Sequence, residues 1–248
     1  MNLVLIGIGL VVGILIGSIG IGGVLLVPSL NYIAGIPIHV GIASVMFSYL
    51  FSGLVGATMF ARRGSIRWSM AGWLCLGAMP GAYAGAATVS LTPAAVLEFL
   101  IATIMIVVGI NALIEQGEPA ATRSWSRGEL MLLGVISGFG SAMSGTGGPL
   151  VLVPILIWLK TPVLMSVGLS QVIQLPIAAL ATVGNWVHGS IDFKLGLMVA
   201  LTLMTGVFVG ARISHAVSSK ALKRLVSVVM VGVGAAMVIK IALRYLVA

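Results

Sequence analysis

The sequence predicts an all-α polytopic membrane protein built from two homologous, inverted repeats. Composition is the first reason: 60% of the residues are hydrophobic, only 7% are charged, and the mean hydropathy is +1.22. No Asp, Glu, Lys or Arg occurs between Met1 and Ala61, and the stretches 68–97, 130–159 and 161–191 are also free of them. Each stretch can cross a hydrocarbon core about 30 Å thick, which takes about 20 residues of helix. The chain therefore crosses a membrane several times.

An internal repeat is the second reason. The segment Gly20–Pro28 recurs as Gly145–Pro154, 125 residues later, with one residue inserted just before the second proline. Duplicated membrane units that are broken by glycine at the same place are typical of transporters with a central binding site. Further matches at the same offset are Pro37 with Pro162, Gly64-Ser65-Ile66 with Gly189-Ser190-Ile191, Gly81 with Gly206, Gly85-Ala86 with Gly210-Ala211, and Gly109 with Gly234.

The repeat divides the chain into residues 1–114, a polar cytoplasmic linker at 115–129, and residues 130–248. Each of the two repeats holds four apolar blocks, and the last three blocks of each repeat have the length of one membrane crossing. The first block can be one long discontinuous helix or a re-entrant hairpin that returns to its own side. The blocks are about 2–38, 40–61, 68–90 and 94–114 in the first repeat and 130–159, 163–187, 195–214 and 223–246 in the second.

The basic residues favour the hairpin. A single crossing divides the Lys and Arg residues eight to five between the two sides of the membrane, whereas a hairpin divides them ten to three. The positive-inside rule favours the second division, with the linker in the cytoplasm and both termini outside. The ten are Arg62, Arg63, Arg67, Arg123, Arg127, Lys160, Arg212, Lys220, Lys223 and Arg224, and the three are Lys194, Lys240 and Arg244.

The glycine-rich breaks are the candidate binding site. An interior glycine costs a helix about 1 kcal/mol relative to alanine, so both segments are expected to break and restart near the bilayer midplane. A helix that starts there presents unpaired N–H groups and partial positive charge, and glycine allows a ligand close to the backbone. Two opposed starts would bind an anion without a buried lysine. The predicted binding residues are Ser18, Gly20, Gly22, Gly23, Ser144, Gly145, Thr146, Gly147 and Gly148.

Small residues can also serve only to let helices pack closely. We expect that role for Gly81, Gly85, Gly206 and Gly210. At the paired breaks we favour a ligand site, because both breaks lie beside hydroxyl side chains at matching positions.

Polar side chains in the second block of each repeat extend the candidate site. Ser44 and Ser48 lie four residues apart and so share one helix face, as do their counterparts in the second repeat. Gln171 and Gln174 are the only glutamines in apolar sequence. Such groups must face the bundle or a wet cavity, where they either line a substrate path or form hydrogen bonds between helices.

Other classes of function receive little support. Cys75 is the single cysteine, and no cluster of His, Cys and carboxylates has ligand spacing, so we predict no metal and no cofactor. The basic residues lie in short loops, so the net charge of +8 does not indicate nucleic acid. The expected partners are a small anion and the lipid bilayer, and a homodimer is compatible with the sequence.

Two alternatives stay open. Ser144 with His188 as a base could form an intramembrane serine hydrolase, but no orienting acid is evident, so we predict no catalytic residues and no enzyme. A passive channel for another small anion or a neutral solute is the second alternative.

The chain resembles the TauE/SafE family of sulfite or organosulfonate exporters over nearly its whole length. The resemblance rests on Gly22–Pro28 and Gly147–Pro154, on the turns at 64–68 and 189–193, and on the small-residue segments at 80–85 and 206–211. It implies export of small sulfur oxyanions or sulfonates across a bacterial inner membrane by a multi-pass protein. The two turns differ, because Arg67 stands where the second repeat has Asp192. Neither the anion, nor the direction, nor the energy coupling follows from the sequence.

Overall fold

The protein is a bundle of helices. A computed structural model describes residues 3–20, 22–113, 125–159, 161–213 and 219–246, and these contain no strand. Most of the predicted linker at 115–129 lies outside them. The elements are α1 (Leu3–Ile19), η1 (Gly23–Leu25), α2 (Leu26–Ala34), α3 (Ile38–Arg62), α4 (Trp68–Leu91), α5 (Ala94–Leu113), α6 (Arg127–Ser144), α7 (Pro149–Trp158), α8 (Val163–His188), α9 (Phe193–Ile213) and α10 (Ser219–Leu246).

Five of the described helices are long and apolar enough to cross a membrane, which confirms the polytopic prediction. They lie in α3, α4, α5, α8 and α9. The first apolar block of each repeat is divided, into α1 followed by η1–α2 and into α6 followed by α7. The helix α6 begins at Arg127, inside the segment predicted as the linker, because Ser126 caps it. The Ser126 hydroxyl accepts a hydrogen bond from the Glu129 N–H at 3.2 Å, and the Glu129 carboxylate accepts one from the Ser126 N–H at 2.9 Å.

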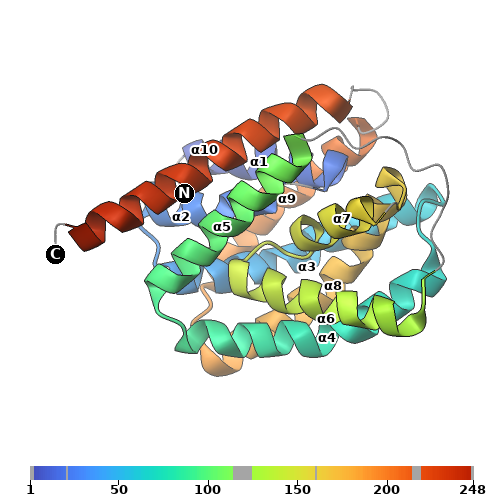
Figure 1. Ribbon diagram of the computed structural model, residues 1–248, viewed down its shortest axis with the longest axis horizontal. Coiled ribbons are helices and arrows are strands. Elements are labelled where there is room, and N and C mark those ends of the chain that lie inside the picture. The colour runs from blue at the N-terminus through green and yellow to red at the C-terminus, as the bar shows by residue number, and fades with distance from the viewer. Residues whose placement is uncertain (1–2, 21, 114–124, 160, 214–218, 247–248) are drawn as a thin grey trace.

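The helices α3 and α8 form the centre of the bundle. Buried residues make up 67% and 61% of their apolar windows, against at most 44% for the other three long apolar helices. The helix α3 packs against α8 and α9, α8 also packs against α4, and the short helices α2 and α7 pack against α3 and α8 respectively. The helices α5 and α10 pack against each other along one side (Figure 1). A buried polar group on α3 or α8 is therefore held inside the bundle.

The contacts between helices repeat when the two halves of the chain are exchanged. The helix α6 packs on α4, and its counterpart α1 packs on the counterpart helix α9. A methyl group added at Gly81 would overlap the carbonyl oxygen of Val135, and one added at Gly206 would overlap that of Leu10. Val135 and Leu10 are themselves 125 residues apart. The same holds for Gly85 and Gly210, so the packing role predicted for these four glycines is confirmed.

Counterpart helices run in opposite directions where they meet. In the contact of α3 with α8, Gly53 lies against Gln174 while Gly56 lies against Gln171, so residue numbers rise in one helix as they fall in the other. The helices α5 and α10 are also antiparallel (Figure 1). The pairs α4–α6 and α1–α9, which are not counterparts, are parallel. The contacting counterpart pairs α3–α8 and α5–α10 are thus antiparallel, whereas the other close pairs are parallel.

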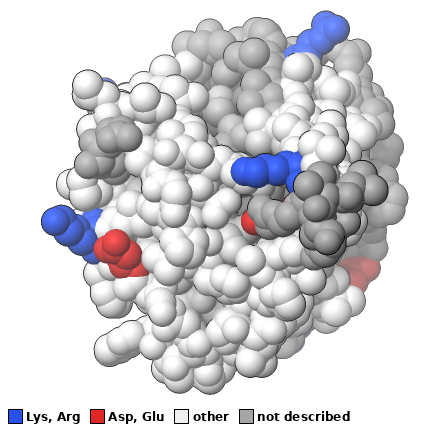
Figure 2. Space-filling view, turned by 90° about the vertical axis from the view of Figure 1, so that its left-hand side faces the viewer, with Lys and Arg blue, Asp and Glu red and all other residues white. Residues whose placement is uncertain are grey.

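The two ends of the bundle differ in the chain segments they carry. Figure 1 marks both termini toward one end of the long axis, which we call the termini end, and α6 begins at the other end, which we call the linker end. Viewed from the termini end, the described surface carries few charged side chains (Figure 2).

We predict that Gly81→Ala destabilises the protein by about 2 kcal/mol, because the added methyl group forces α4 away from the α6 backbone. Gly72→Ala in the same helix is the matched control, since nothing lies within 4 Å of a methyl group there. Thermal unfolding in detergent measures both, and Gly206→Ala should resemble Gly81→Ala. Equal melting temperatures for the Gly81 and Gly72 variants would contradict the proposed close packing.

Candidate functional site

Each glycine break turns the chain back on itself. Gly22 has a φ of 145°, and a Cβ built there would lie 2.8 Å from the Leu15 Cβ and 3.4 Å from the Val12 carbonyl oxygen. The residues after the break therefore lie beside the helix that precedes it. In the second half, the position of a Cβ at Gly140 lies 3.7 Å from a methyl group of Val151, which gives the same relation between α6 and α7.

The two breaks meet at Tyr49, in the middle of α3. The Tyr49 hydroxyl donates a hydrogen bond to the Gly23 carbonyl oxygen at 3.0 Å. A Cβ at Gly147 would lie 2.6 Å from the Tyr49 ring, and one at Gly23 would lie 2.9 Å from the Thr146 carbonyl oxygen. The Tyr49 side chain is fully buried. The starts of the two short helical segments are thus in contact, with one tyrosine wedged against both.

Each break also packs on elements of the opposite half. Gly20 contacts α7 and α8, and Gly145 contacts the counterpart elements α2 and α3. The contact residues are Val153 and Val167 for Gly20, and Val27 and Ile42 for Gly145. Each break therefore depends on the other repeat for its surroundings.

The start of α7 has the features expected of an anion site. Its first hydrogen bonds run from the Val151 and Leu152 N–H groups to the Gly148 carbonyl oxygen, at 3.2 and 3.1 Å. The N–H groups that a helix leaves without an internal acceptor carry its partial positive charge, but Pro149, the first residue of α7, has no N–H to contribute. The start of η1 is similar, since the Leu25 N–H donates to the Gly22 carbonyl oxygen at 3.0 Å, and it has Val24 where α7 has Pro149.

Two hydroxyl groups lie beside the second break. The Ser144 hydroxyl donates to the Gly140 carbonyl oxygen at 2.6 Å and lies 3.0 Å from the Thr146 hydroxyl. Because a hydroxyl carries one proton, Thr146 is then the donor to Ser144. Ser18, beside the first break, is half-buried and donates to the Leu15 carbonyl oxygen at 3.4 Å. The hydroxyls of Ser144 and Thr146 are paired and buried, whereas that of Ser18 bonds only its own helix.

The two glutamines tie α8 to the first half. The Gln171 side-chain amide donates to the Ile16 carbonyl oxygen of α1 at 3.1 Å. That of Gln174 donates to the Tyr49 carbonyl oxygen at 3.2 Å and to the Ser52 hydroxyl at 3.1 Å. Both side-chain carbonyl oxygens are buried without a hydrogen-bond partner in the described part of the chain. Buried polar atoms of this kind are normally satisfied by water or a ligand.

Ser44 and Ser48 are also fully buried, but they serve the contact of α3 with α9. The Ser48 hydroxyl lies 2.9 Å from the Ser44 carbonyl oxygen and 2.7 Å from that of Gly196. The Ser44 hydroxyl accepts a hydrogen bond from the Asp192 N–H at 3.0 Å. This geometry favours hydrogen bonding between helices for both serines, and substrate binding by them stays a prediction.

Sequence reasoning passed over three residues that the structure places here. Tyr49 is one, and Ser137 and Ser141 of α6 are the others, fully buried with hydroxyls that lack a partner among the described residues. They lie four residues apart on the helix face that leads to Ser144. Serines at this spacing in an apolar helix are a signal that could have been read, especially since Val12 and Ile16 occupy the matching positions of the first repeat.

Ser144 and His188 have separate partners in the structure. Ser144 bonds Gly140 and Thr146, whereas the His188 ring nitrogen lies 3.3 Å from the Tyr83 hydroxyl. The geometry gives no support to a Ser–His pair. In the described ranges, no group of three His, Cys, Asp or Glu side chains could hold a metal ion.

We predict that Gly23→Ala destabilises the protein by about 1–3 kcal/mol, because its methyl group would lie 2.5 Å from the Tyr49 hydroxyl oxygen. Tyr49→Phe removes that oxygen and should recover part of the loss when the two changes are combined. Thermal unfolding of the four proteins of this double-mutant cycle measures the coupling. Strictly additive changes would show that the break and Tyr49 do not interact.

Comparison with known proteins agrees with the membrane fold. The family model described as "Sulfite exporter TauE/SafE" matches residues 5–237. The chain is 28% identical over 221 residues to the "Probable membrane transporter protein YdhB" of Bacillus subtilis (strain 168), covering 85% of this chain and 89% of the relative. It is 26% identical over 244 residues to the "Probable membrane transporter protein MJ0441" of Methanocaldococcus jannaschii, covering 91% of each. No solved structure matches significantly. The chain is a multi-pass membrane protein that belongs to the sulfite exporter TauE/SafE family.

Proposed function

We propose that the protein is a secondary-type exporter of small sulfur-containing anions, such as sulfite or an organosulfonate. The anion would bind near the bilayer midplane, between the starts of η1–α2 and α7. The observation that carries this proposal is the contact of the two breaks across Tyr49, which brings two helix starts together inside the bundle. Membership of the family supports the class of substrate.

The chemistry of the site suits an oxyanion. Sulfite and sulfonate oxygens accept hydrogen bonds, and the surroundings supply donors in the form of N–H groups at the helix starts. The hydroxyls of Tyr49, Ser144 and Thr146 would donate to an anion only after each leaves the acceptor that it has in this conformation. Partial positive charge at each helix start stabilises the anion without the cost of burying a lysine. An ammonium or metal cation would find the same charge repulsive.

The same proposal includes inverted repeats and re-entrant hairpins. Since counterpart helices run antiparallel, α8, α9 and α10 cross the membrane in the opposite sense to α3, α4 and α5. The turns at Gly22 and at residues 145–148 would make α1–α2 and α6–α7 hairpins whose turns lie within the bilayer. The linker end is then cytoplasmic, as its arginines indicate.

Tyr49 fills the space between the breaks in this conformation, so an anion can enter only when Tyr49 moves. The fully buried ring supports an occluded state in a cycle of alternating access. The contacts of Gly20 with α7 and α8 match those of Gly145 with α2 and α3. Rocking one half of the chain against the other would loosen the contacts of one glycine as those of the other tighten, and so would drive the cycle of alternating access.

Ligand-induced thermal stabilisation tests the substrate and the site together. The purified protein is mixed in turn with sulfite, sulfate, taurine, sulfoacetate, chloride and phosphate. A true ligand raises the melting temperature, because at 100 times its Kd it adds about 2.7 kcal/mol to the free energy of unfolding. We predict that Thr146→Val weakens that anion about tenfold, because a hydroxyl donor beside the site is lost. Thr88→Val is the control, since its hydroxyl is exposed on α4 and bonds only Ala84.

Valine at Gly22 or Gly148 is a poorer probe, because both glycines have positive φ and any side chain there strains the backbone. No stabilisation by any of the anions would overturn the proposed substrate class. Stabilisation that persists in Thr146→Val would overturn the site. Flux into proteoliposomes that neither saturates nor prefers anions would identify a passive channel instead.

Ser137→Ala and Ser141→Ala give an independent test of the site. If these hydroxyls bind the transported anion, the double variant should melt higher than wild type without ligand, because two buried unpaired hydroxyls are removed. It should also gain less from the stabilising anion. Ser48→Ala is the control and should melt lower, since its hydroxyl has a carbonyl acceptor within 2.7 Å and a second within 2.9 Å. An unchanged anion-induced shift would show that the serines contribute nothing to binding.

A further inference from the structure

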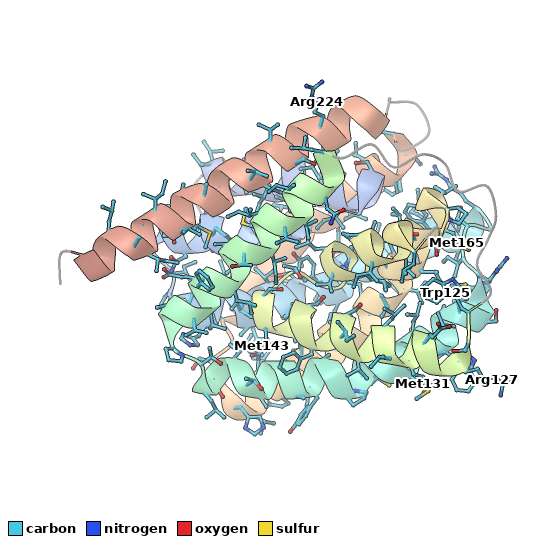
Figure 3. All side chains as sticks on the ribbon, in the orientation of Figure 1. Trp125, Arg127, Met131, Met143, Met165 and Arg224 are labelled. Atoms are coloured by element: carbon cyan, nitrogen blue, oxygen red, sulfur yellow. The ribbon has the colours of Figure 1, made fainter. Side chains whose placement is uncertain are left out.

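A cavity opens at the linker end of the bundle, away from the breaks. It has a volume of about 410 Å³ and lies between the α3–α4 turn and the first turn of α8. Ser65 and Arg67 line it from the turn, and Pro162 and Met165 line it from α8. Figure 3 shows Met165 at the same end of the molecule as Arg127, the first residue of α6.

Arg67 is the basic group of this cavity that is available to a ligand. Its side chain is exposed, and within the described residues no hydrogen bond or ion pair engages its guanidinium. The neighbouring Arg63 is committed, because its guanidinium donates to the Ala211 carbonyl oxygen in the last turn of α9. A guanidinium presents paired N–H donors that match the oxygens of a carboxylate or phosphate, and a sulfonate has the same geometry.

The cavity lies close to the first break. Met165 lines it, and Val167, two residues further along α8, has methyl carbons 3.4 and 3.5 Å from a Cβ built at Gly20. Val167 is 2% exposed and Ile66 is 7% exposed, so a thin apolar layer separates the cavity from the break. An anion held at Arg67 would therefore wait directly outside the proposed binding site.

The matching position at the termini end has the opposite charge. Asp192 lies 125 residues after Arg67 and is exposed. One of its carboxylate oxygens accepts a hydrogen bond from the Leu195 N–H at 2.9 Å, which fixes the carboxylate at the start of α9. Lys194 is also exposed nearby and offsets part of that charge. The two matching turns thus carry side chains of opposite charge at the same position.

We propose that the Arg67 cavity is a loading site for the transported anion, and that Arg67 and Asp192 make capture stronger at the linker end than at the termini end. This inference rests on the proposed anion transport. Fixed charge at an entrance raises the local concentration of an oppositely charged solute and acts over about a Debye length. It leaves the equilibrium distribution of the anion unchanged, so its effect is a lower apparent KM at the linker end.

Transport in membrane vesicles of the two orientations tests the loading site, with the anion that stabilises the wild-type protein as the probe. We predict that Arg67→Glu raises the apparent KM for entry at the linker end about threefold to tenfold at low salt, and by less at high salt. The apparent KM for entry at the termini end should stay within a factor of about two. Asp192→Asn should lower the apparent KM for entry at the termini end only.

Arg62→Glu is the matched control, because Arg62 lies at the same end, is exposed and does not line the cavity. Arg67→Lys keeps the charge and should behave nearly as wild type, and Arg67→Gln serves if the reversed charge impairs folding. An unchanged apparent KM in Arg67→Glu and Arg67→Gln, or an equal change in Arg62→Glu, would overturn the loading site. Wild-type protein that transports none of the anions would overturn the proposed function instead, since the comparison of variants then has no starting point.

Discussion

The contact between the two glycine breaks is the constraint on which the rest of the structure depends. A chain that stops being helical inside a bilayer leaves N–H and C=O groups without partners, and lipid offers none. Here the groups are placed against protein. The Gly23 carbonyl oxygen accepts a hydrogen bond from the Tyr49 hydroxyl, and Gly147 packs against the Tyr49 ring. Gly23 also lies against the Thr146 carbonyl oxygen. Each break can exist only because the other half of the chain covers it.

This constraint explains the arrangement of the surrounding helices. For each break to be covered by the opposite half, the central helices α3 and α8 must lie side by side, and Gly53 and Gly56 allow that approach. The outer pairs α1–α9 and α4–α6 then fix α1 and α6, the helices that precede the two breaks, through close contacts at glycine. The repeated sequence thus specifies a scaffold that neither repeat could form alone.

Several positions that differ between the two repeats hold polar or charged side chains in one repeat, so the two halves are chemically unequal. Ser137 and Ser141 stand where the first repeat has Val12 and Ile16. Tyr49 in α3 has Gln174 of α8 as its neighbour, and Arg67 has Asp192 as its counterpart. If the proposed inverted repeats alternate between two conformations, unequal residues of this kind would allow the two sides of the membrane to be treated differently.

Much of the fold could be predicted from the sequence because it depends on local properties. Apolar length predicts the helices, and α3, α4 and α5 begin and end within two residues of the predicted blocks. Glycine spacing predicts the breaks, since the cost of glycine in a helix is local. The partners across the bundle were not predictable in this way. The sequence left both a substrate path and interhelical bonding open for Ser44 and Ser48, and only the structure shows their contacts with α9. Nothing local in the sequence indicates that Tyr49 contacts both breaks.

Tyr49 also suggests how binding and movement are coupled. Its hydroxyl carries one proton, which it donates to the Gly23 carbonyl oxygen in this conformation. An anion between the helix starts would compete for the same proton, so the hydroxyl can hold the breaks together or bind substrate, but not both. A ligand shifts a conformational equilibrium only by its difference in affinity for the two states. In the proposed cycle, the exchange of one hydrogen bond for another would supply that difference at the point where the two breaks meet.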